Sequence, residues 1–128
     1  MQANPSYRDV VKEISSELLT TAQQLVDAGH EPNRICLDPG IGFGKTLDHN
    51  IDLLKGWETL RGEHDFPILW GVSRKSMIGQ LTGQSASEDR LFGTLGVAAH
   101  AHDVGIDWLR VHDVRAHSDL LNVLRALD

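Results

Sequence analysis

The sequence contains no long hydrophobic run. No apolar stretch approaches the roughly 18 residues that a membrane-spanning helix needs, and the first ten residues, MQANPSYRDV, lack the basic and apolar regions of a signal peptide. We therefore expect a cytoplasmic protein with no membrane partner. The single cysteine, Cys36, excludes an internal disulfide and a multi-cysteine metal site, which fits a reducing compartment. We expect Cys36 to be a small buried residue of a strand.

Positive charge is also scarce. The chain has 12 Lys and Arg residues against 18 Asp and Glu, so its formal net charge is −6. This balance argues against a nucleic-acid partner or an anionic membrane surface, and any anion site must be local. The length of 128 residues, with 41% hydrophobic and 23% charged, suits at most one globular domain, spanning 1–128.

Hydrophobic periodicity predicts the helices and strands. A long amphipathic helix is expected between Pro5 and Gly29, capped by Ser6, and further helices at 48–61, 88–104 and 119–127, with a helical turn at 77–81. Short apolar runs at 34–37, 67–72 and 108–112 predict three buried strands. The expected buried stripe of the first helix is Val10, Ile14, Leu18, Ala22 and Leu25 or Val26, and that of the 88–104 helix is Leu91, Leu95, Ala98 and Ala99.

The alternation of strands and helices indicates an α/β fold, because short connections between parallel strands run through right-handed crossover helices. A complete (β/α)₈ barrel takes about 250 residues. Three strands can therefore form part of a TIM barrel but not all of it. Alternatively they form a small open sheet, whose outer strands would be apolar edges.

Polar residues follow each predicted strand, at the end where parallel α/β folds bind ligands. The period of two places Asp38, Ser73, Arg110 and His112 on one aligned face, with Lys75 just beyond. A carboxylate accepts from the N–H groups of a heterocycle, and Arg and Lys hold an anion. The pattern predicts a site for a polar ring and a phosphate. The alternative for each position is a solvated loop residue.

The glycine-rich loop at 40–46 fits neither common nucleotide motif. A P-loop requires glycine where Pro39 stands, and the dinucleotide fingerprint requires another spacing than glycines at 40, 42 and 44. The seven histidines give no recognisable metal set, since His100 and His102 point to opposite sides of a helix. No Gly-x-Ser-x-Gly elbow occurs, so nucleophilic catalysis is not indicated.

Five segments together resemble one family in order and spacing. They are Leu37-Asp38-Pro39-Gly40-Ile41-Gly42-Phe43-Gly44-Lys45, His49-Asn50, Gly71-Val72-Ser73-Arg74-Lys75-Ser76, Arg90-Leu91 and Arg110-Val111-His112-Asp113, and they resemble the bacterial dihydropteroate synthases. These transferases are TIM barrels of folate biosynthesis and sulfonamide targets. They join 6-hydroxymethyl-7,8-dihydropterin diphosphate to 4-aminobenzoate and release pyrophosphate. The resemblance implies these small-molecule partners, and a homodimer for a full-length chain.

The resemblance also implies roles for single residues. Lys75, Arg110 and His112 would be the catalytic residues, with Arg110 and His112 binding the departing diphosphate. The pterin would be bound by Asp38, Phe43, Gly71, Lys75 and Arg110, and the 4-aminobenzoate by Phe43, Ser73, Arg74 and Lys75. The implied chemistry is dissociative, with pyrophosphate leaving first, so charge stabilisation matters more than proton abstraction.

The chain departs from the family by lacking its amino-terminal half, including two substrate-binding loops. We expect it to supply only strands six to eight of the barrel, with four main helices, and to be inactive alone. The family's Mg²⁺ is bound by an Asn of the missing half, so no metal ligand can be named here. The alternative is a standalone pterin-binding or anion-binding module, or an inactive remnant.

Overall fold

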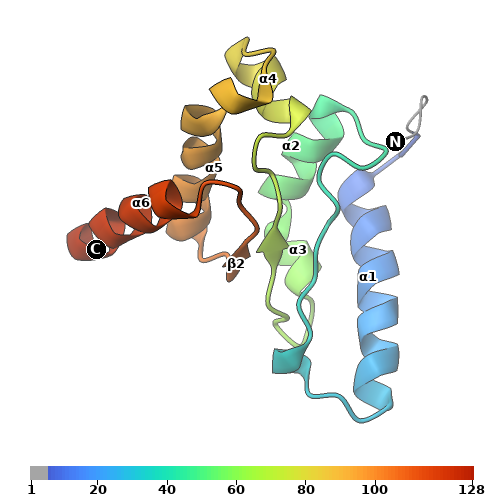
Figure 1. Ribbon diagram of the computed structural model, residues 1–128. Coiled ribbons are helices and arrows are strands. Elements are labelled where there is room, and N and C mark those ends of the chain that lie inside the picture. Colours follow the sequence, from blue (N-terminus) through green and yellow to red (C-terminus); the bar gives the residue numbers. More distant parts are fainter. Residues whose placement is uncertain (1–5) are drawn as a thin grey trace. The chain divides into compact units, whose positions relative to one another are not determined.

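Helices dominate the computed structural model, which describes residues 6–128 (Figure 1). The chain divides into two compact units, the first ending at Trp70 and the second beginning at Gly71. The first contains helices α1 (Val10–Asp27), α2 (Leu47–Lys55) and α3 (Trp57–Arg61), strand β1 (Leu69–Trp70) and a 3₁₀ turn at Pro32–Arg34. The second contains α4 (Ser76–Thr82), a 3₁₀ turn at Ser87–Asp89, α5 (Leu91–Val104), strand β2 (Trp108–Leu109) and α6 (Val114–Leu127).

Helix α1 begins at Val10 because Asp9 caps it. The Oδ1 atom of Asp9 accepts from the Lys12 N–H at 3.1 Å, and Glu13 Oε2 accepts from the Asp9 N–H at 3.0 Å. These carboxylates satisfy amides that the helix leaves unpaired. The prediction of Ser6 as the cap was therefore wrong, and Pro5 lies outside the described residues. The predicted stripe is confirmed at Val10, Ile14 and Ala22, and Leu18 is half-buried. Of the two alternatives at its end, Val26 is half-buried and Leu25 is 40% exposed.

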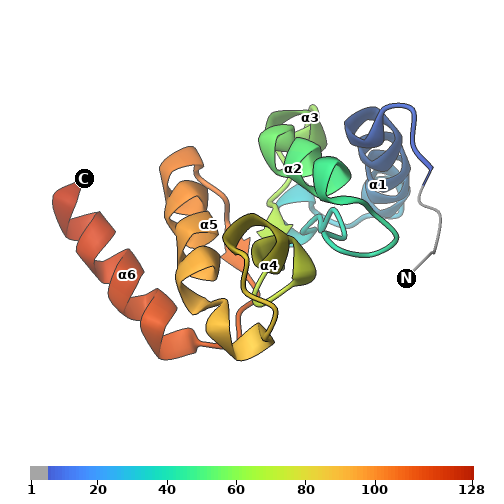
Figure 2. The same cartoon turned by 90° about the horizontal axis from the view of Figure 1, so that it is seen from above.

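The predicted helix at 48–61 is broken at Gly56 into α2 and α3. A Cβ atom at Gly56 would lie 2.7 Å from Val11 Cγ1, so glycine permits the close approach of α1. Helix α1 packs against both α2 and α3 within the first unit (Figure 2). The break at Gly56 interrupts the regular helix but lets both α2 and α3 pack against α1.

The predicted strands are much shorter in the structure. Leu37 forms a single parallel bridge with Ile68, its N–H donating to Pro67 O at 2.8 Å. The run at 34–37 forms no further ladder, because Arg34 belongs to the 3₁₀ turn that Pro32 opens and Pro39 has no N–H to donate. The parallel α/β character is confirmed, whereas three full strands are not found in residues 6–128.

The extended segment around Leu37 does show the predicted period of two. Leu37 and Pro39 are buried, while Cys36 and Asp38 are exposed. The expectation of a buried Cys36 was therefore wrong, because Leu37 carries the buried face. Asp38 shares the exposed face with Cys36.

In the second unit α5 packs against α4 and α6 (Figure 2). Its buried residues are Thr94, Ala98 and Ala101, so the predicted stripe is correct only at Ala98. Small side chains on this face let α4 approach, and a Cβ at Gly93 would lie 2.5 Å from Ile78 Cγ2. Helix α6 begins five residues before the predicted 119, directly after Asp113. Among the described helices, none is long and apolar enough to cross a membrane.

Candidate functional site

In the first unit the candidate site is the loop at 38–46. Asp38 is exposed, and its Oδ1 atom accepts from the Gly40 N–H at 2.9 Å, which starts the turn. Gly40, Gly42 and Gly44 have φ angles of 73°, 88° and 62°, a region that glycine adopts without strain. The glycine spacing that fits no nucleotide motif thus reflects three left-handed positions in one turn. Phe43, between two of them, is 65% exposed.

Lys45 holds this loop from inside. Its Nζ atom donates to Gly40 O and Phe43 O, each at 2.9 Å. Burial lowers the pKa of Lys45, an effect opposed by the carboxylates of Asp38 and Glu17. The Lys45 ammonium is bound to loop carbonyls, whereas a P-loop lysine reaches phosphates. In this structure Lys45 therefore stabilises the backbone of the 38–46 loop.

In the second unit the structure joins two of the motifs through Ser73 and His112. The Ser73 Oγ atom lies 2.8 Å from His112 Nδ1 and accepts from the His112 N–H at 3.1 Å. Ser73 is only 5% exposed, while His112 is exposed. A hydroxyl has one proton to donate. If an anion accepts a hydrogen bond from the Ser73 hydroxyl, that hydroxyl can no longer donate to His112. The Ser73–His112 contact then requires His112 to donate an N–H from Nδ1.

Arg74 and Asp113 form a second link beside this pair. Arg74 Nη2 donates to Asp113 Oδ1 at 2.8 Å and Arg74 Nε donates to Asp113 Oδ2 at 3.2 Å, the two-bond geometry of a planar guanidinium and a carboxylate. The hydrogen bond from Arg74 lowers the pKa of Asp113, and the same bond raises the pKa of Arg74. Two side-chain interactions, Ser73–His112 and Arg74–Asp113, therefore connect the loop at 71–75 to the loop at 110–113.

The remaining predicted site residues of this unit differ in exposure. Gly71 is buried, Lys75 is half-buried and Arg110 is exposed. Lys75 directly precedes α4, and its N–H donates to Val72 O at 3.0 Å. The structure thus brings Ser73, Arg74 and His112 together within one unit. Asp38 and Phe43 belong to the other.

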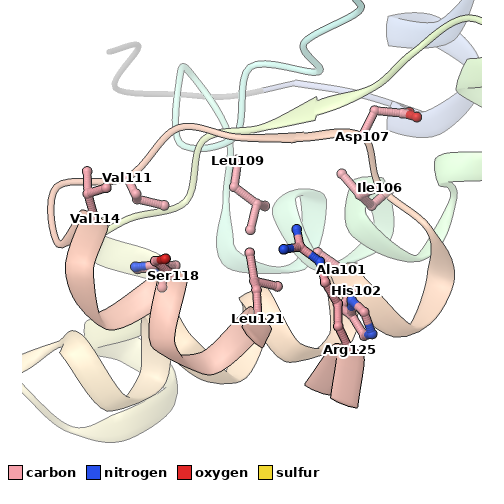
Figure 3. Close-up of a pocket in the computed structure, with 11 residues that line it drawn as sticks. Ala101, His102, Ile106, Asp107, Leu109, Val111, Val114, Ser118, Leu121 and Arg125 are labelled. Atoms are coloured by element: carbon pink, nitrogen blue, oxygen red, sulfur yellow. The ribbon is translucent and has the colours of Figure 1, made fainter. Parts of the chain in front are cut away.

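A separate cavity of about 350 Å³ lies in the second unit among α5, β2 and α6 (Figure 3). Leu109 and Leu121 point toward each other across it (Figure 3). His117 lines it and is buried, with its Nδ1 atom 2.8 Å from Asp113 O. None of the predicted site residues lines this cavity, so it is not part of the candidate site.

Comparison with known proteins decides the family. Residues 1–112 match the model of the family described as pterin binding enzyme. The chain belongs to the pterin-binding enzyme family. It is 47% identical over 127 residues to the dihydropteroate synthase of Neisseria meningitidis serogroup C, a match that covers 99% of this chain and 45% of that relative.

Solved structures of this pterin-binding family agree. The Thermus thermophilus dihydropteroate synthase in complex with 6HMPPP has a TM-score of 0.89 and 41% identity, covering 100% of this chain and 51% of that one. The same enzyme in complex with 4-aminobenzoate has a TM-score of 0.87 and 42% identity, covering 98% and 48%. The chain spans about half the length of the relatives it matches.

Within this member of the pterin-binding enzyme family, the sequence pattern assigns no role to several polar residues that shape the candidate site. Asn50 is buried, and its Oδ1 atom accepts from the Gly42 N–H at 2.9 Å. Lys45, Arg90 and Asp113 also hold the two loops, and all three stand inside the recognised motifs. Thr94 had no such signal, because a lone threonine in an apolar helix is usually a packing residue.

Proposed function

We propose that this chain is the carboxyl-terminal part of a dihydropteroate synthase. The whole protein would join 6-hydroxymethyl-7,8-dihydropterin diphosphate to 4-aminobenzoate and release pyrophosphate. The observation that carries the proposal is the match, over nearly all of this chain, to synthases solved with 6HMPPP and with 4-aminobenzoate. The two ties between the 71–75 and 110–113 loops support it, since they join two of the motifs at the predicted site.

The first unit would contribute to binding the pterin ring. The exposed carboxylate of Asp38 is an acceptor for the amino and ring N–H groups of the pterin. Phe43, exposed on its glycine loop, would wall the aromatic rings of the substrates. The resemblance assigns further pterin contacts to Gly71 and Lys75.

The second unit would bind the two anionic groups. Arg110 and His112 would hold the diphosphate, and Ser73, Arg74 and Lys75 would border the carboxylate of 4-aminobenzoate. Ser73 can donate to that carboxylate while keeping its contact with His112 if His112 carries a proton on Nδ1. The tautomer of His112 would therefore affect the binding of both the diphosphate and the carboxylate.

The proposed reaction moves charge more than protons. The bond between the pterin methylene carbon and the diphosphate oxygen breaks first, and the bonding pair leaves with pyrophosphate. The 4-aminobenzoate nitrogen then bonds to the cationic carbon and loses one proton. Arg110 and His112 stabilise the leaving anion by charge. This dissociative mechanism requires no protein nucleophile.

The family implies Mg²⁺, which proteins commonly hold through one or two side chains together with substrate phosphates and water. Residues 6–128 contain no group of three or more His, Cys, Asp or Glu side chains that could hold a metal ion. No step is therefore assigned to a metal in this chain.

The finer architecture is also a proposal. We assign the extended segment before Asp38, strand β1 and strand β2 as strands six, seven and eight of a (β/α)₈ barrel. The barrel domain would include residues 1–128. A full-length protein would be a cytoplasmic homodimer and a sulfonamide target.

A segment exchange tests the function. This chain replaces the matching segment of the Neisseria meningitidis serogroup C synthase, which is 47% identical, and dihydropteroate formation is measured with both substrates. We expect turnover within about tenfold of the unaltered relative. The same exchange carrying Arg110→Ala and His112→Ala is the inactive control. A folded exchange protein that binds neither substrate would contradict the proposal.

A further inference from the structure

Arg90 makes three hydrogen bonds to the backbone. Its guanidinium donates from Nη1 to Arg74 O at 2.9 Å, from Nη2 to Ser85 O at 2.8 Å and from Nε to Gln84 O at 3.0 Å. One planar group thus fixes three carbonyls from two different segments. Arg90 is half-buried and directly precedes α5, the helix that packs against both α4 and α6.

The carbonyl of Arg74 matters because Arg74 is in the left-handed region, with a φ of 58°. Side chains disfavour this conformation, so surrounding contacts must maintain it. The Arg74 N–H donates to Thr94 Oγ1 at 3.1 Å, while its carbonyl accepts from Arg90. Thr94 is itself fixed, since its hydroxyl donates to Arg90 O at 2.7 Å. The start of α5 therefore clamps Arg74 on both sides.

Ser73 and Lys75 flank the clamped residue. A change in the backbone at Arg74 would redirect both neighbours, moving Ser73 relative to His112 and moving the start of α4. We propose that Arg90 is a positioning residue for 4-aminobenzoate, acting through the Arg74 turn on Ser73 and Lys75. This inference rests on the proposed function of the site.

Gly79 of α4 supplies independent support. A Cβ atom there would lie 2.7 Å from both Nε and Nη2 of Arg90 and 2.6 Å from Gln84 O. Helix α4 thus leaves room for the guanidinium only because residue 79 has no side chain. Gly79→Ala would displace the guanidinium and the Gln84 carbonyl that it binds, without removing the charge of Arg90.

The test uses the exchange protein described above, with Arg90→Lys and Gly79→Ala. Lysine keeps the charge but cannot donate in three fixed directions. We expect either substitution to raise KM for 4-aminobenzoate at least tenfold and to raise KM for the pterin diphosphate by a much smaller factor, because Lys75 belongs to both predicted substrate sets. Arg115→Lys, on the exposed side of α6, is the matched control and should change neither.

A double substitution separates positioning from general stability. In a Ser73→Ala background, Arg90→Lys should raise KM for 4-aminobenzoate by a smaller factor, because one of the residues it positions is already lost. Equal increases in both KM values, or a lowered melting temperature with both KM values unchanged, would overturn the proposal.

A crystal structure of the Arg90→Lys protein decides the structural claim without an activity measurement. We expect Arg74 to leave the left-handed region or Ser73 to lose its contact with His112. Finding both unchanged would overturn the positioning role. The proposed function itself fails separately, if the exchange protein without substitutions makes no dihydropteroate.

Discussion

The loop at 38–46 and the turn at 71–75 reach unusual backbone conformations by different means. In the loop, three glycines adopt positive φ angles, and the bonds that hold it come from Asp38, Lys45 and Asn50, all close in sequence. In the turn, a non-glycine residue, Arg74, is held by side chains 16 to 39 positions away. The loop is thus a local structure, whereas the turn depends on the packing of its whole unit.

This difference suggests different functional sensitivities. A local loop keeps its shape when remote residues change, so substitutions in it should affect mainly the ligand that it contacts. The turn connects Ser73, Arg74 and the 110–113 loop, so substitutions there should affect several steps at once. Four substitutions in the exchange protein test this contrast, beginning with the largest expected effect.

Arg110→Ala should lower turnover by about a hundredfold or more, because removing one preorganised cationic donor from a developing anion has an effect of this size. The KM for the pterin diphosphate should change much less if the Arg110 charge acts mainly on the leaving group. Steady-state kinetics with varied pterin diphosphate measures both. A rise in KM at constant turnover would contradict the role.

Asp38→Asn should weaken pterin binding about tenfold to a hundredfold, since one hydrogen bond to a charged acceptor contributes about 1.5–3 kcal/mol. The amide NH₂ would oppose the ring donors. Because the 38–46 loop is local, the KM for 4-aminobenzoate should stay within twofold. Calorimetry with the pterin diphosphate gives the affinity, and an unchanged value would refute the assignment.

Asp113→Asn should remove a pH-dependent part of the stability. The pKa of Asp113 is lowered from its ordinary 3.8 by Arg74, so its stabilising effect is present above that value and is lost as pH falls through the lower folded pKa. The variant should therefore lose less stability than its parent between about pH 5 and pH 2. Thermal melts across this range measure it. Parallel curves for both proteins would show that the ion pair does not contribute.

Lys45→Met should have the smallest effect, about 1 kcal/mol of stability, because water can replace the ammonium at the Gly40 and Phe43 carbonyls. The KM for 4-aminobenzoate and the turnover should be nearly unchanged. Urea unfolding gives the stability difference. A large loss of turnover would show that the 38–46 loop is not local in its effects.

The same contrast explains what the sequence could reveal. Helix α1, the exposed face of Asp38 and the glycine turn follow from neighbouring residues and can be predicted from them. Three other features depend on distant contacts. The break at Gly56 depends on Val11, the choice of the buried face of α5 depends on Ile78, and the left-handed conformation of Arg74 depends on Thr94. Such contacts join residues far apart in the chain, so no local pattern predicts them.

The expected strand at 34–37 failed for a related reason. The apolar run Ile35-Cys36-Leu37 is typical of a buried strand, but a ladder also needs free backbone donors at its ends. Pro32 and Pro39 limit them, and within residues 6–128 the run forms a single bridge, from Leu37 to Ile68. The motif resemblance was more informative than periodicity here, since it does not depend on the length of a strand.

The central claim is that this chain is one part of a synthase and acts only with the rest. Within the described residues, the second unit exposes apolar surface to solvent. More than 60% of the surface is exposed at each of Phe92, Trp108, Val114 and Leu127. Even a few hundred Å² of missing apolar burial corresponds to about 5–10 kcal/mol, similar to the whole stability of a domain. The chain alone should therefore self-associate or unfold readily.

The most direct measurement is a synthase assay, with light scattering, on the purified chain alone and then mixed with the amino-terminal half of the Neisseria meningitidis relative. We predict an associating, inactive chain that gains dihydropteroate formation when the second half is added. A monodisperse monomer that melts cooperatively and turns over substrate without the added half would contradict the claim. Calorimetric binding of the pterin diphosphate by the inactive chain alone would instead support a standalone binding module.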